Sequence, residues 1–283
     1  MIKLFLKRVF YFLDVLSLDV LIGIVAMMKF VSEVLIGCQL DNSYPILVSL
    51  FMWQVYIGDH IYDSNKKGII LLARHKFYHK KTTLLILWLL LFFTLSIIAI
   101  RYFDFAFFYS FGPIVGVIFL LRVLLRKYPI ISTLLIAFGY TLGIISPLFF
   151  SHESLFKSFA THLFIIQLTI LAASNVIVLN KLEFEEDLMN GDGNIFIAHK
   201  SKYSYDGLAV VCILLQLFVT LYLMNLNALI ILTTNTLIFG IGKLKFTLPK
   251  IFLKVSIELC LAVPFLIKLI IELFSCIYQS IAH

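Results

Sequence analysis

The sequence predicts an all-α fold, a polytopic membrane helix bundle of about nine transmembrane helices that forms a single transmembrane domain over residues 1–283. Apolar residues make up 61% of the chain and charged residues 14%, against about 45–50% and about 25% in soluble domains. A soluble globule of this composition would lack the polar surface to cover itself, and a disordered chain would need the opposite bias. The apolar residues also form continuous runs near the roughly 20 residues that a helix needs to cross a bilayer.

The predicted spans follow one another with little chain between them. The run TTLLILWLLLFFTLSIIAI at 82–100 has no alternation of polar and apolar residues, which favours a helix over a strand of a membrane barrel. The four Cys stand in apolar surroundings without metal-ligand spacing, so the chain is no disulfide scaffold. The predicted spans are 15–37, 44–63, 82–100, 104–122, 129–150, 159–182, 206–223, 226–242 and 253–275.

The basic residues predict the orientation, because Lys and Arg near span ends stay in the cytoplasm. With the N-terminus inside, 19 of the 23 Lys and Arg fall at cytoplasmic span ends, Lys254 among them, and Arg101 and Lys157 fall on the other face. We therefore expect a multi-pass integral membrane protein with a cytoplasmic N-terminus, in the plasma or inner membrane if the source is bacterial. The net charge of +7 is then a topology signal, and no nucleic-acid partner is expected.

Acidic residues gather at two predicted span ends on the cytoplasmic side. Asp59 and Asp63 are four residues apart and so share a helical face. In NKLEFEED at the end of the sixth span, the spacing places Asn180, Glu183 and Asp187 on one face and directs Glu185 and Glu186 elsewhere.

Two acidic faces at the same depth favour a shared cation site. Facing carboxylates repel each other unless cations lie between them, and Mg²⁺ commonly pairs carboxylates with phosphate oxygens of a substrate. Lys and Arg surround both groups, which suits a diphosphate head on a hydrocarbon tail within the bundle. The alternative is that both groups are solvated helix ends.

These motifs resemble those of the UbiA superfamily of intramembrane prenyltransferases, a nine-helix bundle with Asp-rich motifs ending the second and sixth helices. In the first motif, Asp59, His60 and Asp63 stand where the family has Asn, Asp and Asp, and Lys67 replaces the last Asp. The second motif is matched by Glu183, Asp187 and Gly191, with Leu179 and Asn180 at its first two positions. The Arg126-Lys127-Tyr128-Pro129 stretch resembles a basic pair between helices four and five, and Gly139 and Gly143 follow at a spacing that allows close helix packing.

The resemblance implies a Mg²⁺-dependent prenyltransferase of isoprenoid biosynthesis whose partners are the bilayer, a prenyl diphosphate and an unknown hydrophobic acceptor. Asp63 and Asp187 would be catalytic. The metal would be held by Asp59, Asp63, Glu183 and Asp187, and the diphosphate by Lys67, Arg74, Arg126, Lys127 and Asn180.

Several alternatives stay open. The basic loop HKFYHKK at 75–81 is either a solvated flank at the membrane surface or a cover that closes on the diphosphate. Because Lys67 and other residues depart from the family pattern, the protein could instead bind a prenyl lipid or quinone without transfer. A transporter is the third hypothesis, but the acids gather at one face and the sequence shows no repeat.

Other charged residues of the spans are expected to be structural. Lys29 with Glu33, and Lys268 with Glu272, have the spacing of pairs within one helix. Glu258 has no evident partner in its own helix, and Asn175 could bond a neighbouring helix or a substrate.

Overall fold

In the computed structural model, described residues are 2–38, 43–66, 73–102, 117, 121, 124–125, 128–190, 194–198, 204–244 and 249–282. Within some helices only the backbone is described, and the side chains of Asp59, Asp63 and Arg74 belong to this group. The described part is all-helical, as the composition predicts.

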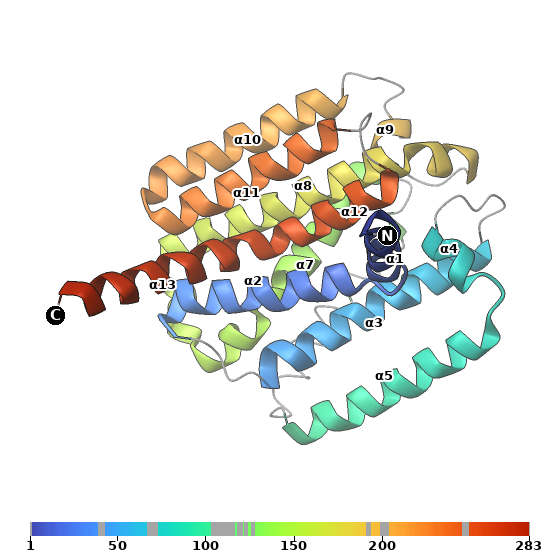
Figure 1. The fold of residues 1–283 in the computed structure, drawn as a ribbon, viewed down its shortest axis with the longest axis horizontal. Coiled ribbons are helices and arrows are strands. Elements are labelled where there is room, and N and C mark those ends of the chain that lie inside the picture. The colour runs from blue at the N-terminus through green and yellow to red at the C-terminus, as the bar shows by residue number, and fades with distance from the viewer. Residues whose placement is uncertain are drawn as a thin grey trace.

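The long helices run side by side along one direction (Figure 1). In the described part, five are long and apolar enough to cross a membrane, or six if the bent pair at the N-terminus is one span. They are α7 (Pro129–Ser151), α8 (Phe159–Asn190), α10 (Ser204–Leu223), α11 (Leu226–Lys243) and the α12–α13 stretch Lys250–Cys276. The chain is therefore a multi-pass membrane bundle.

The other predicted spans have different outcomes. A helix, α3 (Ser43–Lys66), covers the predicted span 44–63, but it also carries polar residues such as Gln54 and His60 and is not among the five. The apolar stretch Thr82–Ile98 of α5 (Thr82–Tyr102) is shorter than the others. The span predicted at 104–122 falls almost wholly outside the described residues.

The first predicted span, 15–37, corresponds to α2 (Leu18–Ile36), but a helix that was not predicted precedes it. This helix, α1 (Ile2–Val15), meets α2 at a bend of 72°. Ser17 at the bend has a φ of 50°, in the left-handed region that helices do not use. The basic N-terminal stretch is thus a helix that lies across the direction of α2.

The helix of the sixth predicted span, 159–182, is longer than the span itself. α8 continues to Asn190, so the acidic residues lie on its last turns, where helical spacing gives them a shared face. α8 is also the most buried of the candidate spans, with α7, α10, α11 and α12 packed around it.

The last predicted span has an internal break. A single 3-10 turn at Cys260–Ala262 separates α12 (Lys250–Leu259) from α13 (Val263–Ala282). Pro264 explains this break, because proline has no N–H to donate to the carbonyl four residues earlier.

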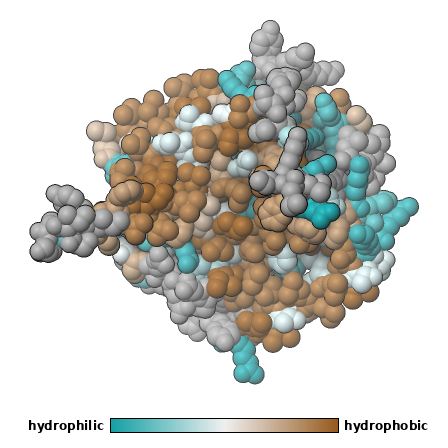
Figure 2. Space-filling view, in the orientation of Figure 1, coloured by the Kyte–Doolittle hydropathy of each residue, from teal (hydrophilic) through white to brown (hydrophobic). Residues whose placement is uncertain are grey.

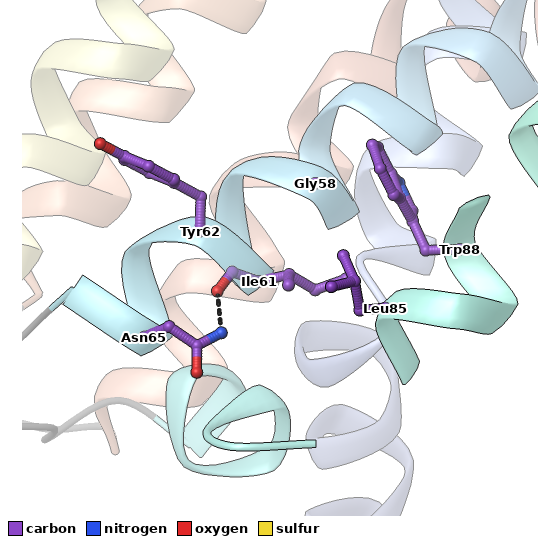
Figure 3. A pocket seen from close by; sticks show the side chains of 6 residues that line it. All are labelled: Gly58, Ile61, Tyr62, Asn65, Leu85 and Trp88. Carbon is purple, nitrogen blue, oxygen red and sulfur yellow. Dashed lines mark hydrogen bonds between the residues drawn. The ribbon is translucent and has the colours of Figure 1, made fainter. Parts of the chain in front are cut away.

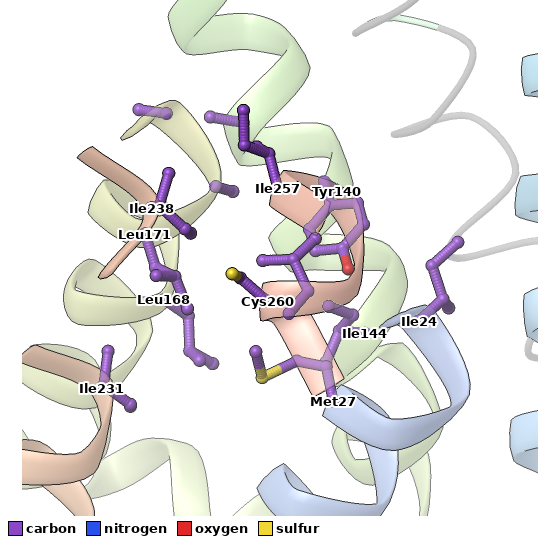
Figure 4. Close-up of a cluster of buried hydrophobic side chains, with 14 of the residues drawn as sticks. Ile24, Met27, Tyr140, Ile144, Leu168, Leu171, Ile231, Ile238, Ile257 and Cys260 are labelled. Carbon is purple, nitrogen blue, oxygen red and sulfur yellow. The ribbon is translucent and has the colours of Figure 1, made fainter. Parts of the chain in front are cut away.

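The core is apolar and dense around α8. Figure 4 shows side chains of α2, α7, α8, α11 and α12 meeting there, including Met27, Ile144 and Leu171. Gly143 of α7 lets Met52 of α3 come close, since a Cβ at Gly143 would lie 2.7 Å from the sulfur. This contact agrees with the close packing expected from the Gly139–Gly143 spacing.

Polar and apolar surfaces are separated along the bundle. Apolar atoms cover most of the face in Figure 2, and hydrophilic atoms gather toward the right-hand edge, the side of α4 (Ala73–Tyr78) in Figure 1. The buried polar residues described next lie toward this end.

Candidate functional site

The last turns of α8 carry three carboxylates that face into the protein. Glu183, Glu186 and Asp187 are spaced three and four residues apart, so they share one side of the helix. Glu186 is fully buried and Asp187 is buried, whereas Glu185 between them is exposed. The prediction that Glu186 points away is therefore wrong, because three residues along a helix return close to the same face.

Glu183 forms a buried ion pair with Lys254 of α12. The Lys254 ammonium contacts Oε1 of Glu183 and lies 3.9 Å from Oδ1 of Asp14, which comes from the end of α1. Only 3% of Lys254 is exposed. Lys254 therefore lies in the protein interior as a member of an ion pair, and it is not a solvated flank of its span.

Glu186 pairs with a histidine from a distant part of the sequence. Nδ1 of His75 in α4 lies 2.9 Å from Oε1 of Glu186, and both side chains are buried. The His75 ring is 5.9 Å from the ring of His60 in α3, and Nε2 of His60 is 3.1 Å from Oγ of Ser17 at the α1–α2 bend. α4 thus connects the ends of α3 and α8.

The segment 75–81 is only partly a solvated flank. Its first half is helical and buries His75 and Tyr78. Burial raises the pKa of the Tyr78 phenol to about 12, which keeps its hydroxyl protonated at physiological pH. The chain after α4 is tied to α3, because Nδ1 of His79 donates to the carbonyl of Ser64 at 2.7 Å.

Asp187 is held by an asparagine that follows α8. Nδ2 of Asn194 donates to Oδ2 of Asp187 at 2.7 Å and to the carbonyl of Asn180 at 2.8 Å. The carbonyl of the Asn194 side chain accepts from the Phe196 N–H at 2.9 Å. Asn194 therefore fixes the chain return after α8 against the acidic turn.

We call these residues the polar cluster: Asp14, Ser17, His60, His75, Glu183, Glu186, Asp187, Asn194 and Lys254. It combines carboxylates, imidazoles and one ammonium at one end of an apolar bundle. Charged groups are costly in such a setting and usually mark a functional site.

A second group of polar contacts lies deeper in the bundle and joins neighbouring helices. Nδ2 of Asn175 donates to Oε2 of Glu258 at 3.1 Å, which gives both residues a partner on a neighbouring helix. Lys268 of α13 forms an ion pair with Glu33 of α2 at 3.3 Å, so this pair joins two helices and not residues within one helix as predicted.

The structure describes the side chains of some predicted site residues but not of others. Glu183 and Asp187 lie on successive turns of α8 in the polar cluster, and Asn180 one turn earlier contributes its backbone carbonyl. Residues 59, 63 and 74 lie in helices, but the side chains of Asp59, Asp63 and Arg74 fall outside the described part, and Lys67, Arg126 and Lys127 fall outside it entirely.

Sequence reasoning missed three members of the polar cluster that pair across long separations. His75 and Glu186 are 111 positions apart, and Lys254 is 71 positions from Glu183. The only local signal was a charged residue within an apolar run at Lys254, four residues before Glu258. Helical spacing finds residues on one face, but it does not say which other helix that face meets.

No protein family, curated protein or solved structure matches this chain.

Proposed function

We propose that the protein is an intramembrane prenyltransferase of the UbiA type, which moves an isoprenyl group from a prenyl diphosphate to an aromatic or lipid acceptor. One observation carries the proposal: the polar cluster gathers at one end of an apolar helix bundle. Such an arrangement suits a substrate with a charged head and a hydrocarbon tail.

The charge of the polar cluster supports binding of a diphosphate together with cations. Asp14, Glu183, Glu186 and Asp187 supply four carboxylates, whereas Lys254 and the half-buried Lys250 supply two ammonium groups among the described residues. Added positive charge would offset this excess, and the basic residues Lys67, Arg74, Arg126 and Lys127 would neutralise the diphosphate.

The described carboxylates do not form a magnesium site by themselves. Among the residues that the structure describes, no three His, Cys, Asp or Glu side chains could hold a metal ion together. Glu183 already binds the Lys254 ammonium and Asp187 the Asn194 amide. The proposed Mg²⁺ site therefore depends on Asp59 and Asp63 joining Asp187.

In the proposed reaction, the allylic C–O bond of the prenyl diphosphate breaks and its electron pair goes to the departing diphosphate. The acceptor then bonds to the allylic carbon and releases a proton. Lys254 and the basic residues stabilise the charge that develops on the diphosphate oxygens, and apolar helices exclude water from the allylic cation. We also propose that the end of the bundle that holds the polar cluster faces the cytoplasm.

The test is release of diphosphate from prenyl diphosphates of several lengths by the purified protein in membranes, with Mg²⁺ added or chelated. Asp63→Asn and Asp187→Asn should each lower the rate roughly a hundredfold. Glu185→Gln is the matched control, since Glu185 is an exposed acid of the same α8 segment. Equal rates in Asp187→Asn and in the parent would refute the proposal.

The ion pair between Lys254 and Glu183 favours a second candidate function, in which the protein binds a prenyl lipid or quinone without transfer. Here the ammonium takes the place of a metal on Glu183. Saturable binding of a non-hydrolysable prenyl diphosphate, combined with no diphosphate release from the natural compound by the same preparation, would select this second function.

A further inference from the structure

A groove lies between α3 and α5, on the side of α3 away from the polar cluster. Its volume is about 500 Å³, and it is lined by Gly58, Ile61, Tyr62, Asn65, Leu85 and Trp88 (Figure 3). Gly58 and His60 are two residues apart, so they lie about 160° apart around the helix axis. The groove is therefore separate from the site proposed for transfer.

The walls of the groove are apolar and fixed. Nε1 of Trp88 donates to the carbonyl of Gln54 at 2.8 Å, which holds the indole against α3. The lack of a side chain at Gly58 lets the Trp88 ring lie directly against α3, because a Cβ at this position would lie 2.7 Å from the ring. Tyr62 and Leu85 are exposed, so the groove opens to the surroundings of the bundle, where lipid chains lie.

One end of the groove is polar and positively charged. The Oδ1 of Asn65 accepts from the Lys80 N–H at 3.2 Å, and His79 binds the carbonyl of Ser64. These two bonds hold the turn between α4 and α5 at the last turn of α3. They place the exposed Lys80 and Lys81 next to Asn65.

Lys81 lies at the end of the groove where α5 begins. It directly precedes α5, and its carbonyl accepts from the N–H of Leu85, which lines the groove, at 3.4 Å. The Lys81 ammonium is 3.9 Å from the centre of the Phe77 ring, which keeps the charge at this turn. An apolar channel with fixed positive charge at one end complements an anionic amphiphile.

We propose that this groove binds an acyl chain of an anionic phospholipid from the bilayer, with the lipid phosphate held by Lys80 and Lys81. Basic pockets between membrane helices bind anionic lipid head groups in this way. From Gly58 to Asn65 the helix rises about 10 Å, enough for the first part of an acyl chain below its head group. The lipid would fasten α5 to α3 and does not take part in transfer.

The experiment uses Trp88 as the reporter, because the chain has only one other tryptophan. In a Trp53→Phe background, the full-length protein is placed in vesicles with rising fractions of phosphatidylglycerol or phosphatidylcholine carrying the same brominated acyl chains. Bromine quenches the indole on contact. The fraction of brominated lipid that gives half-maximal quenching should be at least about fivefold smaller for phosphatidylglycerol than for phosphatidylcholine. This is the preference expected from one lysine near a membrane surface.

Two sets of variants separate the head group from the groove. Lys80→Gln with Lys81→Gln should remove the preference for phosphatidylglycerol, whereas Lys7→Gln with Lys157→Gln makes the same change of charge elsewhere and should keep it. Leu85→Gln makes a wall of the groove polar without touching the space that the Trp88 ring fills beside Gly58, and it should weaken quenching by both lipids.

Three results would overturn the proposal. The first is identical quenching curves for the two lipids in the parent. The second is an unchanged preference after Lys80 and Lys81 are replaced. The third is recovery of fluorescence on adding a prenyl diphosphate but not on adding unbrominated phosphatidylglycerol, which would make the groove a substrate site.

Discussion

Replacing Lys254 by methionine tests whether the polar cluster is held together by its one buried ammonium. Methionine keeps much of the side-chain volume but leaves Glu183 and Asp14 without their cation. At 3.9 Å and an effective dielectric constant of about 20, the attraction between Lys254 and Asp14 alone is about 4 kcal/mol. Removing one partner of a buried pair costs about 3–5 kcal/mol, because the remaining charge stays buried. We expect Lys254→Met to lower the free energy of unfolding by about this amount.

The assay is unfolding of the purified protein in mixed micelles with a rising fraction of dodecyl sulfate, followed by circular dichroism. Lys157→Met is the matched control, since Lys157 is exposed, and it should change the free energy of unfolding by less than about 0.5 kcal/mol. Adding Glu183→Gln and Asp14→Asn to Lys254→Met should restore most of the loss, because no unpaired charge of this trio then remains. If Lys254→Met and Lys157→Met unfold at the same dodecyl sulfate fraction, the reasoning about this ion pair is refuted.

Three further predictions follow from packing, pairing and topology. Gly143→Leu should destabilise the bundle by about 1–3 kcal/mol through contact with Met52, and Met52→Ala should relieve this in the same micelle unfolding assay; no relief would place the clash elsewhere. His75→Leu should cost about 1–3 kcal/mol by leaving Glu186 without this hydrogen bond, and an unchanged transition would show that α4 is not held there. In a cysteine-free background, a membrane-impermeant thiol reagent outside intact cells should label Lys157→Cys but should label Glu185→Cys only after the membrane is opened; the reverse pattern would invert the proposed orientation.

The helices were predictable from the sequence because membrane helices need long apolar runs, and α7, α10 and α11 begin and end close to their predicted bounds. The features that the apolar runs did not predict depend on polar or special residues. The bend at Ser17 depends on a left-handed backbone conformation that the apolar pattern does not reveal. The extension of α8 to Asn190 depends on tertiary partners, since a polar helix end becomes favourable once His75 and Lys254 bind it.

For the candidate site, the sequence predicted the acidic face of α8 but not the residues of other helices that contact it. Glu183 and Asp187 were predicted to bind a metal, and in the structure they contact Lys254 and Asn194. Which residues of other helices meet a given face depends on how the helices cross, and the spacing along one helix carries no information about this.

The length of α8 has a consequence for where charge can be accommodated. Its apolar part, 159–179, already matches the roughly 30 Å thickness of the hydrocarbon layer. The 11 residues that follow, 180–190, add about 16 Å of helix, so Glu183, Glu186 and Asp187 stand at the level of the lipid head groups. Under the proposed function, the phosphate of a substrate meets this end of α8 at the aqueous boundary, while its hydrocarbon chain lies among the apolar helices below.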